Sequence, residues 1–177
     1  SALKNLKTDI GKVSGHEPEI KYTNKPDSKE VIIVGTIGKS PIIDQLIKSK
    51  KLDVKNISGK WESFVIQTID SPFPGVEKAL VIAGSDKRGT IYGIYDVSRN
   101  IGVSPWYYWA DVPIVKQESL FVKNGRYVTD SPKVKYRGIF LNDEAPALSG
   151  WSKETFGGFN SKFYEKVFEL VLRLKGN

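Results

Sequence analysis

Two hydrophobic patterns alternate along the chain, and each predicts a different kind of element. Near the amino terminus, apolar residues recur at spacings of three and four, which predicts an amphipathic helix that ends at Gly15. They are Leu3, Leu6, Ile10 and Val13. Helical spacing recurs after Ser40-Pro41, from Thr90 to Ile101, and from Phe163 to Leu174. We therefore expect three further helices.

Short apolar runs between these helices predict strands. Val31 to Val34 has no polar alternation, which is typical of a strand buried on both faces. Phe64 to Asp70 and Ala79 to Ala83 are two further strands, and the proline-rich segment between them cannot continue a ladder. A shorter strand is expected at Leu120 to Lys123. Helices interleaved with strands in this way indicate an α/β fold.

The pattern changes near residue 131, where Asp130-Ser131-Pro132 has the composition of a linker. A strand is expected at Val134 to Leu141, followed by a long loop over 142–158 and a final helix. We therefore predict two domains, residues 1–130 and 131–177. One strand-loop-helix unit cannot bury both of its faces. We expect the apolar stripe of its helix, Phe163, Val167, Leu170 and Leu174, to be exposed and to favour pairing with a second copy.

Composition narrows the chemistry that the chain can perform. It has no cysteine and a single histidine, His16, which excludes disulfides, thiol nucleophiles and histidine-rich metal sites. We expect no metal and no cofactor. The net charge of +7 is scattered along the chain, so nucleic acid is not an expected partner. No apolar run reaches membrane-spanning length. Because residue 1 is serine, we expect a processed or excised chain, whose signal peptide would lie outside it.

Three motifs have both a binding and a structural interpretation. Gly35 to Ser40 resembles a phosphate-binding loop but is two residues short of one, which favours a plain strand-to-helix turn. Gly84 to Gly89 places two cations at a helix start, where an anion could bind, although Gly89 and Gly93 favour close helix packing. Trp106 to Trp109 could stack sugar or base rings, or could plug a domain interface. The pattern alone leaves that choice open.

The segment from Arg137 to Glu144 has the most chemical character. Alternation along a strand places Arg137 and Asp143 on one side, with Asn142 and Glu144 on the other. Carboxylates at the carboxyl end of a parallel strand lie where barrel enzymes build active sites. A structural ion pair or a helix cap would use the same residue types, and spacing does not separate these roles.

Three segments together closely resemble the amino-terminal region of glycoside hydrolase family 115, the xylan α-glucuronidases. They are residues 84–93, 103–113 and 135–151, and the resemblance extends over about residues 31 to 177. It implies a mixed-sheet α/β domain like the non-catalytic domain of β-hexosaminidases, followed by the first βα unit of a (β/α)8 barrel. The implied parent is an inverting enzyme that removes glucuronic acid or its 4-O-methyl ether from xylan, and this chain alone is not expected to catalyse.

The resemblance also implies roles for single residues. Asp143 and Glu144 are the implied catalytic carboxylates, and Arg137, Asn142 and Trp151 the implied substrate-binding residues. Inversion needs two separated carboxyl groups, so at least one is expected from a later barrel strand. The implied partner is glucuronoxylan or its oligosaccharides, and the implied location is periplasmic or secreted. A stand-alone carbohydrate-binding module that uses the Trp106 to Trp109 segment is the alternative.

Overall fold

The computed structural model describes residues 1–177, which separate into two compact units, Ser1–Lys133 and Val134–Asn177. The first unit contains a four-stranded mixed sheet in the order β1-β3-β2-β4. Its strands are β1 (Glu30–Thr36), β2 (Phe64–Asp70), β3 (Lys78–Gly84) and β4 (Arg126–Thr129). β1 is parallel to β3, whereas β2 is antiparallel to both β3 and β4. The predicted α/β class with a mixed sheet is confirmed.

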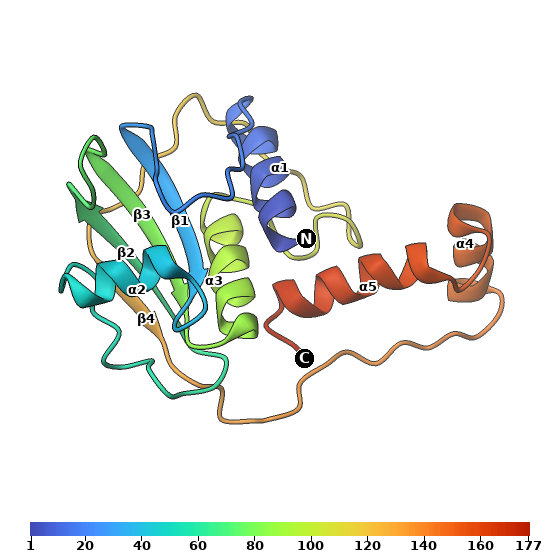
Figure 1. Cartoon of the computed structure of the whole chain (residues 1–177). Coiled ribbons are helices and arrows are strands. Elements are labelled where there is room, and N and C mark those ends of the chain that lie inside the picture. The colour runs from blue at the N-terminus through green and yellow to red at the C-terminus, as the bar shows by residue number, and fades with distance from the viewer. The chain divides into compact units, whose positions relative to one another are not determined.

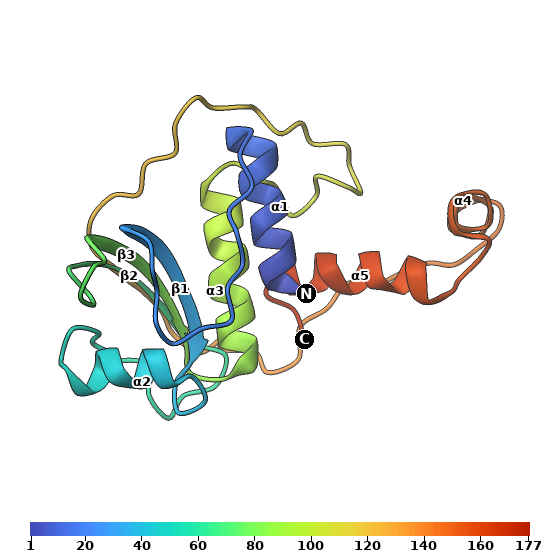
Figure 2. The same cartoon turned by 45° about the horizontal axis from the view of Figure 1, so that its top comes forward.

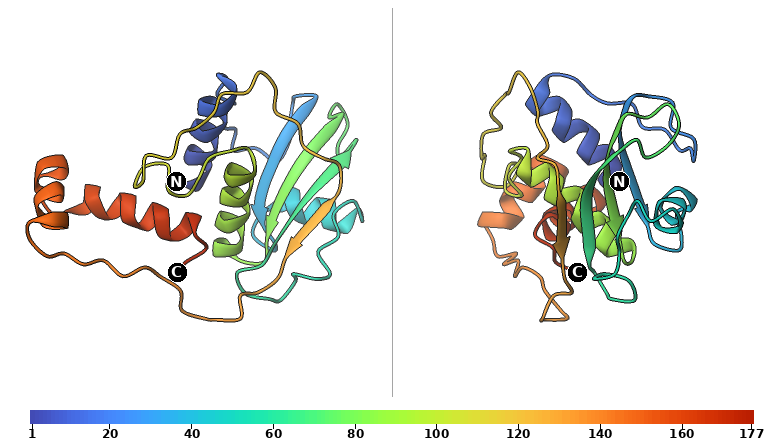
Figure 3. Two further views of the ribbon diagram at one scale, coloured as in Figure 1. Left: turned by 180° about the vertical axis from the view of Figure 1, so that it is seen from behind. Right: turned by 90° about the vertical axis from the view of Figure 1, so that its left-hand side faces the viewer.

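Three helices cover this sheet (Figure 1). α3 (Lys87–Asn100) packs on one face and α1 (Ala2–Ser14) packs against α3, whereas α2 (Pro41–Lys48) covers the opposite face (Figure 2). Viewed from the side, the sheet lies between α2 and α3 (Figure 3). All three helices were expected from their apolar spacing, and α1 ends at Gly15 in the left-handed conformation, as predicted.

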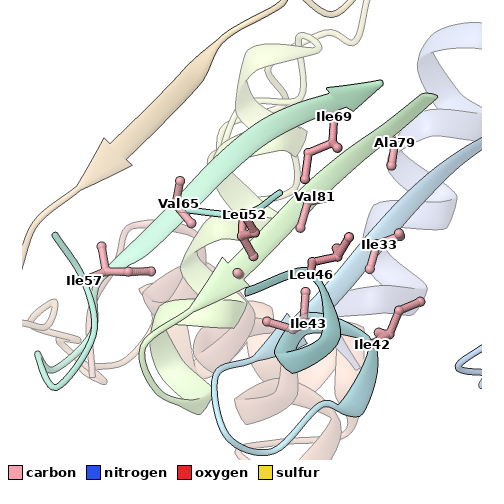
Figure 4. Close-up of a cluster of buried hydrophobic side chains, with 11 residues drawn as sticks. Ile33, Ile42, Ile43, Leu46, Leu52, Ile57, Val65, Ile69, Ala79 and Val81 are labelled. Carbon is pink, nitrogen blue, oxygen red and sulfur yellow. The ribbon is translucent and has the colours of Figure 1, made fainter. Parts of the chain in front are cut away.

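The core follows the two-residue period of the strands. On one face of the sheet, side chains of β1, β2 and β3 pack against α2 (Figure 4). This cluster includes Ile33, Ile43, Leu46, Val65, Ile69, Ala79 and Val81. The alternate positions, among them Phe64 and Ile82, face the other way, where a Cβ added at Gly93 of α3 would meet both. β2 and β3 therefore contribute to a core on each face of the sheet.

β1 corrects one expectation about burial. The run Val31 to Val34 was predicted to be covered on both faces, but β1 is an edge strand whose only neighbour is β3, and Ile32 is 41% exposed. The strand buried on both faces is β3, in which every residue from Ala79 to Gly84 is buried. The reason is the strand order, because β3 has a strand on each side and a helix over each face, α2 on one and α3 on the other.

The last strand of the sheet is also displaced from its predicted position. Residues 120–123 form no strand, and Phe121 is exposed. The strand is β4, where Tyr127 and Val128 pair with β2. Gly125 precedes it with a φ of +152°, and its amide donates to the Thr68 hydroxyl at 2.9 Å. Pairing with β2, which is remote in sequence, decides which residues become the strand.

The second unit contains α4 (Ala147–Phe156) and α5 (Ser161–Arg173). The prediction of a loop throughout 142–158 was wrong, since α4 occupies most of it and ends at Gly157 in the left-handed conformation. The predicted strand over 134–141 forms no ladder. Arg137 and Ile139 are half-buried while Tyr136 and Phe140 are exposed, so the segment keeps a two-residue period without a paired strand.

α5 also corrects the predicted exposure of its apolar stripe. Phe163, Val167 and Leu170 are buried, and only Leu174, at 38%, is exposed. Phe163 lies in edge-to-face contact with Trp151, Phe156 and Phe159 of its own unit. This aromatic packing covers Phe163, whereas Tyr164 and Phe168 of the same helix are exposed at 41% and 60%. No helix of the chain combines the length and the apolar character that crossing a membrane would require.

Candidate active-site segment

The segment from Asn142 to Glu144 connects the unpaired stretch 134–141 to α4. All three side chains are exposed. The Glu144 amide donates to Asn142 Oδ1 at 3.4 Å, a short turn that holds the two ends of the segment together. A cis peptide bond between Ala145 and Pro146 follows. The segment therefore presents an amide and two carboxylates from one exposed turn.

Arg137 lies at the other end of the same stretch. Its Nε donates to the Lys175 carbonyl at 2.8 Å, and its Nη1 donates to the carbonyls of Val134 at 2.7 Å and Lys135 at 3.1 Å. Strand alternation predicted this guanidinium on the same face as Asp143, whereas these hydrogen bonds of its side chain go to backbone carbonyls. The Arg137 side chain is occupied by backbone oxygens of its own unit.

Trp151 is in the first half of α4 and is 38% exposed. Its ring meets Phe156 at 5.5 Å and Phe163 at 6.5 Å between centroids, both edge to face. Such pairs add about 0.5 to 1.5 kcal/mol beyond area burial. The indole is therefore anchored between α4 and α5, with part of its surface still accessible.

Two family models match the chain. The model of the glycosyl hydrolase family 67 N-terminus matches residues 1–97, and the model of glycosyl hydrolase family 115 matches residues 129–177. A solved structure described as a novel family GH115 4-O-methyl-α-glucuronidase with specificity for decorated arabinogalactans is 37% identical, with a TM-score of 0.83. That match covers 99% of this chain and 22% of the other. The chain belongs to glycoside hydrolase family 115.

The family 115 resemblance seen in the sequence is thereby confirmed, and it applies to the amino-terminal region of the family. The chain spans 22% of the length of the solved family 115 structure that it matches. Comparison with curated protein sequences gives no match.

In this family 115 region, the Gly84 to Gly93 motif has a structural role in packing. The carboxylate of Asp86 caps α3 by accepting from the Gly89 amide at 2.7 Å, and it also accepts from the Glu62 amide at 2.8 Å. An anionic side chain thus occupies the helix start where a bound anion would have to lie. Arg88 donates to Glu62, whose side chain is 4% exposed, at 3.2 Å. Both observations support the structural interpretation of the motif.

The Trp106 to Trp109 segment is a turn and does not form a flat platform. Tyr107 and Tyr108 are inclined at 66°, and Tyr108 and Trp109 at 87°. The Lys12 ammonium lies 4.3 Å from the Tyr107 ring centroid. Neighbouring rings that are nearly perpendicular cannot stack along one sugar chain, and one ring face already carries a cation from α1. The geometry favours packing against the helical layer over sugar stacking.

The Gly35 to Ser40 loop is likewise filled by protein groups. The Gly38 amide donates to the carboxylate of Asp44 at 2.8 Å, and a Cβ at Gly35 would meet the Ser40 side chain at 2.5 Å. An amide of this loop is therefore used by an acidic side chain. No group of three or more histidine, cysteine, aspartate or glutamate side chains is arranged to hold a metal ion.

Sequence reasoning missed the contacts between Arg137 and the end of α5. The Asn177 amide donates to the Arg137 carbonyl at 2.9 Å, and the Arg137 amide donates to Asn177 Oδ1 at 3.1 Å. Gly176 after a long apolar helix was a signal for a helix end. Nothing in the local pattern indicated that this end would contact residues forty positions earlier in the chain.

Proposed function

We propose that this chain is the amino-terminal region of an inverting α-glucuronidase that removes glucuronic acid or 4-O-methyl-glucuronic acid from xylan. The observation that carries the proposal is the match along 99% of the chain, at 37% identity, to a family 115 4-O-methyl-α-glucuronidase. Because the match covers 22% of that protein, the activity is proposed for a longer parent enzyme. The 177-residue chain alone is expected to be inactive.

The two parts of the chain have different proposed roles. Residues 1–130 are an accessory α/β domain like the non-catalytic domain of β-hexosaminidases, and residues 131–177 are the first strand-loop-helix unit of a (β/α)8 catalytic barrel. The order of a stretch with a two-residue period, a turn with two carboxylates and a helix supports the second assignment. In a barrel, this turn would lie at the carboxyl end of the first strand, where active sites are built.

The proposed chemistry uses the turn directly. In an inverting glycosidase one carboxyl group protonates the leaving oxygen, and another, about 6.5 to 9.5 Å away, activates the attacking water. Asp143 and Glu144 are the proposed catalytic carboxylates of this unit, and the partner at the required separation comes from a later barrel strand. Asn142 and Trp151 are proposed to contact the sugar, since an amide and a half-exposed indole suit hydroxyl and ring recognition.

The substrate gives the proposal a cellular context. Glucuronoxylan and its oligosaccharides are extracellular polymers and fragments, so the parent enzyme is proposed to act in the periplasm or after secretion. A second substrate class is favoured by one observation, because the matched family 115 structure is described as having specificity for decorated arabinogalactans. Both candidates carry glucuronic acid side groups, so the same catalytic turn would serve either.

The test is release of the free acid by the parent enzyme. Glucuronoxylan and a glucuronic-acid-decorated arabinogalactan are incubated with the enzyme in parallel, and released glucuronic or 4-O-methyl-glucuronic acid is quantified. Release from xylan supports the first substrate, and release from arabinogalactan alone moves the proposal to the second. No release from either, by an enzyme with a cooperative melting transition, would contradict the glucuronidase assignment. The chain of residues 1–177, assayed alone, is expected to release none.

A further inference from the structure

α5 ends in a tightly closed turn. The Lys175 amide donates to the Leu172 carbonyl at 3.1 Å, and the Gly176 amide donates to the Val171 carbonyl at 2.7 Å. Lys175 has a φ of +59°. This pair of bonds around a left-handed residue is the Schellman arrangement, which satisfies carbonyls that the helix itself leaves open. The turn aims the Lys175 carbonyl and the Asn177 amide group out of the helix end.

The extended stretch at 135–137 is fastened to this turn by Asn177. The main-chain amide of Asn177 donates to the Arg137 carbonyl at 2.9 Å, and its side-chain Oδ1 accepts from the Arg137 amide at 3.1 Å. Its Nδ2 donates to the Lys135 carbonyl at 2.6 Å. A Cβ at Gly176 would lie 3.0 Å from the Arg137 carbonyl, so the two backbones meet closely. Both backbone polar groups of Arg137 are thereby used.

The guanidinium of Arg137 completes the junction. It donates to the carbonyls of Val134, Lys135 and Lys175, which lie on both sides of the contact. Its positive charge is placed beside the carboxyl end of α5, where the helix dipole favours a cation. Because a guanidinium is planar, three such bonds fix its orientation as well as its position.

We propose that Arg137 is a positioning residue, which clamps the start of the 134–141 stretch to the end of α5 and thereby sets where the turn of Asn142, Asp143 and Glu144 lies. The proposal deepens the glucuronidase assignment and rests on it for its catalytic consequence. It replaces the direct contact with a sugar hydroxyl that the family resemblance implied for this arginine.

The position of the guanidinium distinguishes a positioning role for Arg137 from direct contact with a sugar hydroxyl. Arg137 and Asp143 are six positions apart, and an extended chain advances about 3.3 Å per residue, so the span between them approaches about 20 Å. The guanidinium is held at the far end of that span by carbonyls of residues 134, 135 and 175. Arg137 therefore acts on the turn through the backbone that joins them.

The test uses the parent enzyme with Arg137→Ala, Asn177→Ala and the double variant. The clamp predicts that each single variant lowers kcat by about 10- to 100-fold, as for a displaced catalytic group, with KM nearly unchanged. The double variant is expected to be no slower than the slower single variant, because both substitutions open the same junction. Lys135→Ala is the matched control, since the junction uses the Lys135 carbonyl while its side chain lies over Tyr136.

Three kinetic outcomes would overturn the proposal. One is a raised KM for Arg137→Ala with wild-type kinetics for Asn177→Ala, which would assign the arginine to the sugar. Another is wild-type kcat in both single variants. The third is a double variant whose losses multiply, which would mean that the two residues act independently.

A second measurement stands apart from activity, so a failure of the glucuronidase assignment is distinguishable. Backbone order parameters of residues 138–144, measured by ¹⁵N relaxation on the 177-residue chain, are expected to fall in Arg137→Ala and Asn177→Ala and to stay at wild-type values in Lys135→Ala. Unchanged order parameters in the first two variants would overturn the clamp even if the parent enzyme releases no acid.

Discussion

Replacing Gly93 with alanine is expected to destabilise the first unit, because the helix α3 touches the sheet at that position. The new Cβ would lie 2.7 Å from Ile82 Cγ2 and 3.2 Å from the Phe64 ring, and both of those side chains are fully buried. Carbon atoms pack at about 3.5 to 4.0 Å, so α3 has to move away by nearly 1 Å. Overpacking of this kind costs about 1 to 3 kcal/mol.

Alanine also favours a helix over glycine by about 0.5 to 1 kcal/mol, which offsets part of the cost. The net expectation for Gly93→Ala is a loss of about 1 to 2 kcal/mol in the free energy of unfolding, or roughly 3 to 8 °C in Tm. Gly150→Ala is the matched control, since it lies inside α4 with no atom within 4 Å of its Cβ position. It is expected to be neutral or stabilising by up to about 1 kcal/mol.

Thermal and urea unfolding of the wild-type protein, Gly93→Ala and Gly150→Ala measure these changes in stability. A Gly93→Ala protein that melts at or above the wild-type temperature would refute the argument that the glycine motif exists for close packing. The same result would reopen the anion-binding interpretation of Gly84 to Gly89, which titration with inorganic phosphate would then examine.

Asp143→Ala in the parent enzyme is expected to reduce activity by about 10² to 10⁴ and to leave the Tm near wild type, because the carboxylate is exposed; a proportionate loss of both would make the residue structural. Arg88→Ala is expected to lower the free energy of unfolding by about 1 to 2 kcal/mol, because it removes the guanidinium that lies 3.2 Å from the buried Glu62 carboxylate. The loss is modest because the Arg88 side chain is 53% exposed, and kcat is expected to be maintained. The hydrogen bond from Lys60, with that from the Ser131 amide, lowers the pKa of Asp130 below its ordinary 3.8. A lowered pKa stabilises the fold above pH 3.8 and loses that effect as pH falls through the lowered value, so Asp130→Asn is expected to reduce the Tm slightly at pH 7 and by progressively less as the pH falls below 3.8. A reduction that does not shrink as the pH is lowered would contradict this origin.

Local patterns were sufficient for elements whose burial follows from their own sequence. α1, α2, α3 and α5 were each predicted from apolar residues at helical spacing, and the glycine at the end of α1 has the left-handed conformation expected of it. β2 and β3 were also predicted, because a continuous apolar run bounded by turn residues has few alternatives. In these cases the pattern that predicts the element lies within the element's own residues.

The failures share a dependence on residues far away in the chain. Val31 to Val34 looks like an inner strand, yet its burial depends on how many strands lie beside it. The stretch 134–141 has strand-like alternation, but a strand needs a paired partner and none is present in its unit. α4 was hidden by Pro146 and Gly150, which are usual in loops, and the ring contacts of Trp151 with α5 helped to decide otherwise.

The candidate site likewise has one part that the local sequence predicts and another that depends on residues far away in the chain. The Asn142 to Glu144 turn could be singled out because chemical side chains follow a strand-like stretch, whereas the bonds of Arg137 to Lys175 and Asn177 are contacts across forty residues that no local pattern encodes. A guanidinium and a carboxylate on one side of a strand suggested a shared ligand. The backbone carbonyls near the guanidinium gave it a different set of partners.

Proton NMR of the first product formed by the parent enzyme tests the central claim most directly. A 4-O-methyl-glucuronosyl xylo-oligosaccharide is added to the wild-type enzyme and, as a control, to the Asp143→Ala variant, and the anomeric proton of the released acid is followed from the first minutes. Hydrolysis of the α-linkage with inversion predicts that the β-anomer appears first and then mutarotates, with the variant strongly slowed. Initial appearance of the α-anomer, or no release by the folded wild-type enzyme, would contradict the proposal of an inverting α-glucuronidase.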